Sequence, residues 1–345
     1  MRIVVTRYGG PDALQVVEEE APEPKPGEVR VRVLAAGVAL PDVMMREGFH
    51  PETPAVPFTP GWDLVGVVDR VAAGVSGIEP GQSVAALPIF GAYTEFLCLS
   101  PRDLVPVPAG LDPGEAVSLV LNYVTAYQMM HRSAKVAAGQ SVLIHGAAGG
   151  VGSALVQLGA VAGLKMYGTC SAARAQAVSE MGAIPIDYRA QDFVAEIRRL
   201  TGAGVDAVFD GMGGPHMWRS HKALRRGGRV VVYGLTASLS GGRSTGNRVA
   251  RRNRFHGMPR FALYIAGGLV LPGRKRVVPY SIQWLKRLKP SVFREDLSTL
   301  LDLLKQEKIN PVIAARFPLG EARRAHELLG QEGVTGKIVL LCNAR

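Results

Sequence analysis

Three glycines spaced three residues apart, Gly146, Gly149 and Gly152, are the residues of this 345-residue sequence whose spacing most clearly suggests chemistry. They lie in SVLIHGAAGGVGSALVQLGAVAG, which reads as a strand, a tight turn and a helix. Glycine lets the backbone approach a pyrophosphate closely, and the first N–H groups of the following helix point at the phosphates. The spacing therefore predicts a dinucleotide-binding loop. The alternative is a glycine turn that only permits close packing of helix on strand.

The end of the next expected strand indicates which dinucleotide would bind. An NAD-binding protein usually presents Asp or Glu there to the ribose 2′-hydroxyl. The segment GTCSAAR has no carboxylate, whereas Ser171 could hydrogen-bond a 2′-phosphate and Arg174 could pair with it through its planar guanidinium. The segment favours NADPH over NADH. An ordinary solvated arginine in the first turn of a helix is the alternative for Arg174.

The elements that position these residues follow two different patterns. After Asp112, strand and helix patterns alternate, with apparent strands SVLIH, KMYGT, IPID, VDAVF and RVVVYG. This alternation predicts an α/β fold with a doubly wound parallel sheet. Before about Leu104, short apolar runs broken by Pro and Gly predict a β-rich, partly barrel-like domain. Two helices, near 295–307 and 319–329, precede an apolar strand, KIVLLC, that could complete the first domain.

Composition excludes several classes of protein. Nearly half of the residues are apolar and a fifth are charged, as in an ordinary globular protein. The three cysteines, Cys98, Cys170 and Cys342, lie far apart, which predicts neither a disulfide framework nor a cysteine zinc site. No secretory signal is visible in MRIVVTRYGG, and the longest apolar stretch, 261–271, is too short to span a bilayer. We expect a soluble, cytoplasmic protein.

The net charge of +11 is unevenly distributed. Residues 211–294 hold eighteen Lys and Arg and no acidic residue, which leaves 22 basic against 29 acidic residues elsewhere, a net charge of −7. We expect one strongly basic face, for which a solvated surface that assists NADPH capture is favoured. Runs such as RVARRNR, 248–254, keep contact with nucleic acid or an anionic membrane open as the alternative.

Ordered motifs along nearly the whole chain resemble one family. They are YGGPDALQVVE, PKPGEVRVRVLAAGV, PFTPGWDLVGVV, GAYTEF, NYVTAY, HGAAGGVGSALVQL, IDYRAQDF and TGKIVLL. Together they resemble the medium-chain dehydrogenase/reductase superfamily, in its zinc-free quinone oxidoreductase branch that includes zeta-crystallin and the VAT-1-like proteins. The resemblance implies a GroES-like, partly barrel-shaped substrate domain of residues 1–121 with 285–345, and a Rossmann-like NADPH domain of residues 122–284. The cofactor is expected in the cleft between them.

The residues at the zinc-ligand positions differ from those of the zinc-dependent relatives. Those relatives carry a cysteine and a His-Glu pair, because catalytic zinc needs thiolate or imidazole ligands. Here the corresponding residues include Ala39, in GVALPD, and Trp62, in GWD, and neither can ligate zinc. We expect no bound metal and a metal-free mechanism.

By resemblance, a set of residues contributed by several elements should line the cofactor. They are Asn122, Thr125, Ala148, Gly149, Gly150, Val151, Ser171, Arg174, Tyr188, Tyr233 and Gly234. Asn122 and Tyr123 are expected near the nicotinamide. A surface residue is the alternative for Tyr188, and a buried amide satisfied by backbone is the alternative for Asn122.

No catalytic residue can be named from the sequence, but four candidates should line the cleft. They are Phe49, Tyr93, Asn122 and Tyr123. Many quinone and enoyl reductases of this kind carry Asn where this chain has Ala39, and a Tyr near the place of Phe49, so the pocket should be more apolar. A proton could come from solvent or from the phenol of Tyr93 or Tyr123. His50 and His216 are expected to be lone structural or surface histidines.

The favoured reading is a hydride transfer from NADPH to a quinone or an α,β-unsaturated carbonyl, with the protein supplying orientation and exclusion of water. One alternative is a cofactor-binding regulatory protein of the VAT-1-like type, which binds RNA or a membrane surface with little turnover. The other is an enoyl-thioester reductase. The segment RVVPYSI, 276–282, reads as an edge strand that relatives pair across a two-fold axis, so we expect a homodimer. The segment 240–273 has no assigned role.

Overall fold

The computed structural model describes residues 1–214, 216–234, 275–331 and 333–342. The chain forms two compact units, Met1–Val124 with Leu285–Arg345, and Thr125–Trp284. The sequence placed the corresponding boundaries after residues 121 and 284. The segment 240–273 and the basic run 248–254 lie outside the described residues. Within the described residues, no helix is long and apolar enough to cross a membrane.

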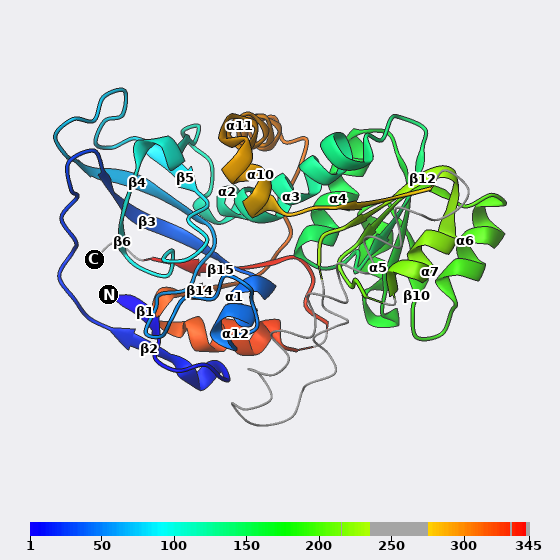
Figure 1. The fold of residues 1–345 in the computed structure, drawn as a ribbon, viewed down its shortest axis with the longest axis horizontal. Helices are drawn as coiled ribbons and strands as arrows, with labels where there is room; N and C mark the ends of the chain where they lie inside the picture. The colour runs from blue at the N-terminus through cyan, green and yellow to red at the C-terminus, as the bar shows by residue number, and fades with distance from the viewer. Residues whose placement is uncertain (215, 235–274, 332, 343–345) are drawn as a thin grey trace. The chain divides into compact units, whose positions relative to one another are not determined.

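The second unit is built on a six-stranded parallel sheet (Figure 1). Its strands are β8 (Ser141–His145), β9 (Lys165–Cys170), β10 (Ile184–Asp187), β11 (Val205–Asp210), β12 (Leu224–Val232) and β13 (Arg276–Pro279). Its helices are η4 (Gln128–Ala134), α4 (Gly150–Val161), η5 (Ala172–Arg174), α5 (Ala175–Glu180), α6 (Phe193–Thr201) and α7 (His216–Ala223). All five strands expected from the sequence are present.

The strand order of this sheet is β10-β9-β8-β11-β12-β13. Numbered from β8, this is the order 3-2-1-4-5-6 of a Rossmann-like doubly wound sheet. The order reverses between β8 and β11, so the turns that follow these two strands lie at the switch point where such sheets bind their ligands. Strands covered on both faces are rich in Val and Ile, and here Val208, Val230 and Val277 lie in one buried cluster.

The first unit holds a mostly antiparallel sheet (Figure 1). Its strands are β3 (Val29–Val38), β4 (Leu64–Val71), β5 (Ser83–Ala86), β6 (Phe96–Leu99), β7 (Val105–Pro106), β14 (Ile313–Pro318) and β15 (Lys337–Leu341), with a separate pair of β1 (Arg2–Val5) and β2 (Leu14–Val17). Strand β3 alternates apolar and polar residues, which buries Val29, Val31 and Val33 on one face. The sheet is GroES-like, as the family resemblance implied, and it confirms the β-rich first domain that the sequence pattern predicted.

The C-terminal strand β15 completes the first unit. It pairs antiparallel with β3, and Ile338 lies opposite Val38. It also pairs in parallel with β14, a strand that the sequence analysis did not identify. The remaining helices are η1 (Pro11–Ala13), α1 (Leu40–Arg46), η2 (Pro101–Asp103), α2 (Pro113–Ser118), η3 (Leu119–Tyr123), α3 (Val124–Tyr127), α10 (Ile282–Leu288), α11 (Pro290–Lys305), η7 (Leu319–Glu321) and α12 (Ala322–Leu329).

Candidate dinucleotide site

The glycine turn joins β8 to α4 at the switch point. Gly146 has a φ of +66°, and Gly149 stands at the N-cap of α4 with no side-chain hydrogen bond capping the helix. The first N–H groups of α4, contributed by Gly150 and the residues after it, are therefore open to an anion. A Cβ on Gly152 would lie 2.1 Å from the carbonyl oxygen of Gly146. The close approach of turn and helix requires glycine there.

A polar corner forms where β9 and β10 end. Ser171 follows β9 directly, and the Nε of Arg174 donates to the Ser171 Oγ at 3.3 Å. The N–H of Tyr188 donates to the carbonyl oxygen of Cys170 at 3.2 Å, which places Tyr188 beside the same strand end. The Tyr188 side chain is 47% exposed, with the Arg189 guanidinium 5.8 Å from its ring centroid. The structure thus brings together Ser171 and Arg174, the two residues expected at the 2′-phosphate, and Tyr188, which was expected to line the cofactor.

Tyr233 and Gly234 follow β12 on the other side of the switch point. The N–H of Tyr233 donates to the carbonyl oxygen of Asp210 at 3.0 Å, beside the turn that leaves β11. A Cβ on Gly234 would lie 2.3 Å from the carbonyl oxygen of Gly211. This contact holds the segment after β12 against the turn after β11.

Asn122, Tyr123 and Thr125 come from the helical run that joins the two units. All three are buried, and Asn122 and Tyr123 lie in the π-helical turn η3. Such turns are rare and occur often at functional sites. Burial raises the pKa of the Tyr123 phenol, so this group keeps its proton at neutral pH. The contacts of these residues with a cofactor stay a prediction.

Tyr93 is fully buried within the first unit and belongs to a hydrogen-bonded group. Its hydroxyl lies 3.2 Å from the Nε2 of His326, whose Nδ1 lies 3.0 Å from an Nη of Arg46. Because a guanidinium can only donate, Nδ1 accepts and Nε2 donates to the phenol oxygen. Burial and the nearby Arg46 lower the pKa of His326 to about 3, so its ring is neutral. Phe49 is half-buried just after α1.

The residues at the expected zinc-ligand places do not fit a metal. Ala39 has no donor atom, and Trp62 packs edge-on against His50. Of the carboxylates nearby, Asp42 accepts two backbone N–H groups, at 2.9 and 3.0 Å, and Asp63 pairs with the Nζ of Lys337 at 2.8 Å. These carboxylates are engaged in holding the fold, so we derive no step that uses zinc.

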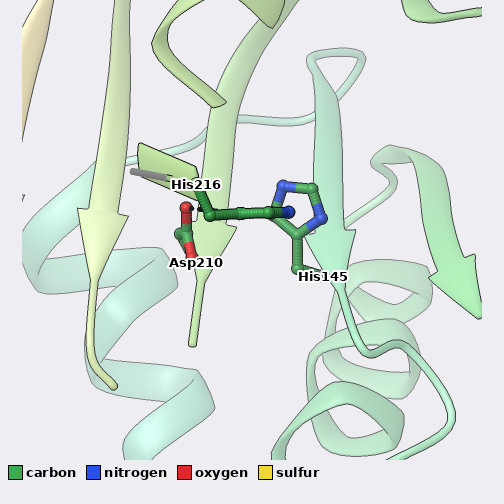
Figure 2. A group of neighbouring side chains, drawn as sticks. All are labelled: His145, Asp210 and His216. Carbon is green, nitrogen blue, oxygen red and sulfur yellow. Dashed lines mark hydrogen bonds and ion pairs between the residues drawn. The ribbon is translucent and has the colours of Figure 1, made fainter. Parts of the chain in front are cut away.

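Three side chains converge at the switch point in the second unit: His145, Asp210 and His216 (Figure 2). Their nearest ligand-type atoms lie within 4.8 Å of one another, which is close enough to hold a metal ion. However, the Ser220 Oγ lies 2.7 Å from the Oδ2 of Asp210 and 3.1 Å from the Nε2 of His145. A hydroxyl bonded to both groups favours a hydrogen-bonded network over a metal site.

The sequence analysis treated His216 as a lone histidine, and the structure corrects this. Its Nδ1 lies 3.2 Å from the Oδ2 of Asp210. The sequence carried no signal for the group, because His145 and Asp210 end two different strands that become neighbours only when the sheet forms. The carboxylate, two imidazoles and hydroxyl form one polar group, which is buried except for the partly exposed His216.

Comparison with known proteins shows which family models and relatives this chain is similar to. The family described as alcohol dehydrogenase GroES-like domain matches residues 25–109, and the one described as zinc-binding dehydrogenase matches residues 181–340. The human synaptic vesicle membrane protein VAT-1 homolog is 31% identical over 98% of this chain and 86% of its own length. Human quinone oxidoreductase is 29% identical over 99% of this chain and 98% of its own length.

A solved structure shows the same architecture. The Escherichia coli quinone oxidoreductase complexed with NADPH superposes with a TM-score of 0.84 and 28% identity, covering 99% of each chain. A Rossmann-like sheet of order 3-2-1-4-5-6 in one unit and a GroES-like sheet in the other define a medium-chain dehydrogenase/reductase. With these relatives, the chain belongs to that superfamily of oxidoreductases. Within it, the chain falls in the zinc-free branch that holds the quinone oxidoreductases and the VAT-1 homologues.

Proposed function

We propose that this chain is an NADPH-dependent oxidoreductase that uses no metal and reduces a quinone or an α,β-unsaturated carbonyl. The observation that carries the proposal is the pairing of Arg174 with Ser171 directly after β9, where no carboxylate would repel a 2′-phosphate. The relative from Escherichia coli, a quinone oxidoreductase complexed with NADPH, supports the cofactor and the acceptor class.

Each group of residues has a role in this proposal. Bound NADPH supplies a hydride from C4 of its nicotinamide to an electrophilic carbon of the acceptor. The backbone N–H groups of Ala148, Gly150 and Val151 bind the pyrophosphate, while the Gly149 N–H donates to the Gly146 carbonyl oxygen and closes the turn. Ser171, Arg174 and Tyr188 hold the 2′-phosphate end. Asn122 and Tyr123 orient the nicotinamide, and the buried, apolar setting of their helix excludes water.

The cofactor assignment is tested by titration calorimetry with NADPH and NADH. Arg174→Ala should weaken NADPH binding about 10- to 100-fold, the effect of losing a charged hydrogen bond, and change NADH binding little. Arg199→Ala is the matched control, because Arg199 is an exposed arginine of the same unit that pairs only with Glu196 in the contacts described. If the wild type bound neither NADPH nor NADH, the proposal would be wrong.

Turnover separates the candidate functions. NADPH oxidation is followed with 1,4-benzoquinone, 9,10-phenanthrenequinone and crotonyl-CoA. Faster oxidation with the quinones supports the proposed acceptor, whereas preference for crotonyl-CoA would indicate the enoyl-thioester reductase. Tight NADPH binding with no oxidation would favour the regulatory alternative that the VAT-1 relatives suggest.

The basic stretch, residues 211–294, supports binding of nucleic acid or membrane less than it supports a solvated surface. In its described part, four basic residues form ion pairs with acidic residues outside the stretch. The pairs are Arg219 with Asp192, Arg225 with Asp206, Lys286 with Asp103 and Arg287 with Glu52. These pairs offset part of the positive charge that the composition indicated. A solvated basic surface therefore remains the favoured interpretation.

A further inference from the structure

A buried chain of hydrogen bonds runs from Asp210, at the end of β11, to the glycine turn after β8. The Oδ1 of Asp210 accepts the N–H groups of Met212 and Gly213, at 2.8 and 3.0 Å, and so fixes the turn after β11. Its Oδ2 accepts the hydroxyl of Ser220 at 2.7 Å and the Nδ1–H of His216 at 3.2 Å. With four donors, this carboxylate is saturated.

Asp210 determines which group donates and which accepts in every hydrogen bond of this series. Ser220 donates its only hydrogen to the carboxylate, so its oxygen must accept from the Nε2 of His145 at 3.1 Å. The Nδ1 of this neutral ring then accepts from the Thr169 hydroxyl at 3.1 Å. The Thr169 oxygen in turn accepts the N–H of Gly146 at 3.2 Å. Burial lowers the pKa of His145 to about 3, in agreement with the neutral tautomer.

This series of hydrogen bonds therefore connects the turns that follow β8 and β11, the two strands on either side of the switch point. His145, Thr169, Asp210 and Ser220 are all less than 5% exposed. Hydrogen bonds in such a setting are little weakened by competing water, and a missing partner leaves a buried polar group unsatisfied. The position of the Gly146 N–H is thereby tied to Ser220 in α7, a residue that follows it by 74 positions.

We propose that Thr169 and Ser220 are positioning residues for the dinucleotide. Thr169 holds the Gly146 N–H directly, and Ser220 acts on Thr169 through His145, so that both keep the glycine turn in the conformation that receives the pyrophosphate. This rests on the proposed function. The family resemblance assigned neither residue a role, and neither is placed among the residues that contact the cofactor. In this proposal, the three neighbouring side chains of His145, Asp210 and His216 (Figure 2) belong to the network and are not a metal site.

The test uses two variants that remove one hydroxyl each. Thr169→Val keeps the shape of the side chain, and Ser220→Ala removes a link at the far end of the chain. Each should raise the Kd and the KM for NADPH about tenfold and leave kcat nearly unchanged. Because both hydroxyls are links in one series of hydrogen bonds that reaches the Gly146 N–H through Thr169, the double variant should lose little more than either single variant. Thr169→Ser, which retains the hydroxyl, should restore most of the affinity.

The matched control is Ser118→Ala, which removes a buried hydroxyl bonded to the Gly114 carbonyl oxygen in the first unit. It should lower stability without changing the Kd for NADPH. Fully additive effects of Thr169→Val and Ser220→Ala, or an unchanged Kd in both, would overturn the proposal. One equivalent of bound zinc or iron that is lost in His216→Ala would also overturn it, in favour of a metal site.

A second measurement needs no cofactor. Amide hydrogen exchange of the apo protein should speed up at Gly146 and the following turn in both Thr169→Val and Ser220→Ala, and remain unchanged in Ser118→Ala. If the wild type binds no nucleotide but the exchange responds as expected, the positioning network stands and only the proposed function fails. Unchanged exchange in Ser220→Ala would refute the network itself.

Discussion

At the scale of single residues, the dinucleotide site depends on what is missing as much as on what is present. Gly152 has no side chain where the Gly146 carbonyl oxygen approaches, and the strand end before Ser171 carries no acid. Both features are visible in the sequence, because each lies within one short run of residues. Their physical reasons, space for backbone and charge toward a 2′-phosphate, are local as well.

Gly152→Ala tests the space requirement. The added Cβ would meet the backbone of Gly146 and Ala147, which cannot rotate away, so the turn must shift. We expect the free energy of unfolding to fall by about 1–3 kcal/mol and NADPH binding to be lost. Chemical denaturation and calorimetry measure the two effects. Gly320→Ala, where the added Cβ meets nothing within 4 Å, is the control and should change neither. Retained NADPH affinity in Gly152→Ala would contradict the close approach.

Asp42 predicts a dependence of stability on pH. Burial, with the nearby Asp63, raises its pKa from 3.8 to about 7 in the folded chain. Between these values the folded state binds a proton that the unfolded state has lost. This group therefore favours folding fully below about pH 4, and that contribution disappears as the pH rises through about 7.

The measurement is urea unfolding of the wild type and Asp42→Asn between pH 5 and 8.5. The variant cannot titrate at this position, so the difference in unfolding free energy, wild type minus variant, should fall as the pH rises. Parallel pH profiles of the two proteins would show that Asp42 is already ionised at pH 5.

At the scale of elements, the C-terminal strand β15 is tied to the first unit by a buried ion pair. The Nζ of Lys337 lies 2.8 Å from the Oδ2 of Asp63, and both side chains are at most 2% exposed. Lys337→Met should lower the free energy of unfolding by about 3–5 kcal/mol, because it leaves a buried carboxylate unpaired. The double variant Asp63→Val with Lys337→Met should regain most of this loss. Thermal and urea unfolding give both values, and an equally unstable double variant would argue against the ion pair.

The elements were predictable to different extents. The five Rossmann-like strands were found because each is a short apolar run closed by glycine or a turn, and KIVLLC was correctly expected to join the first unit. Strand β14 was missed, since its sequence IAARFP alternates only half-buried and exposed residues and so lacks a strongly apolar face.

The polar groups were missed for a different reason. Lys337 and Asp63 are 274 positions apart, and His145 and Ser220 are 75 apart. No local pattern signals that such residues will meet, because only the assembled fold brings them together. The glycine turn was therefore predictable from the sequence, and the network behind it was not.

At the scale of the whole molecule, the expected homodimer stays a prediction that β13 makes testable. This strand is at the edge of the six-stranded sheet. The Tyr280 N–H donates to the carbonyl oxygen of Val232 in the neighbouring strand, so by alternation the Val277 N–H points away from β12, to the side where no strand of the described residues pairs with β13. Pairing of two such edges across a two-fold axis would use this group.

Val277→Pro should therefore yield monomers in sedimentation velocity, whereas Val277→Ala, which keeps the N–H, should remain dimeric. Val277→Ala removes more of this buried side chain than Val277→Pro does, so loss of packing would not explain monomers that appear only with proline. A Val277→Pro protein that is folded and still dimeric would exclude β13 as the interface. A monomeric wild type would show that the predicted homodimer does not form.

The pairing of β15 with β3 also affects the order in which the two units can fold during synthesis. The unit Thr125–Trp284 is contiguous, so a ribosome releases all of it before the last sixty or so residues emerge. The other unit has its first half synthesised early, yet the edge of β3 stays open until Lys337–Leu341 arrive. During translation, the Thr125–Trp284 unit can fold first, while the other unit waits with an exposed, apolar strand edge that is prone to aggregation. A message truncated shortly before codon 337 would produce a chain with an intact Thr125–Trp284 unit and an unfinished first unit, a natural target for chaperones and proteases.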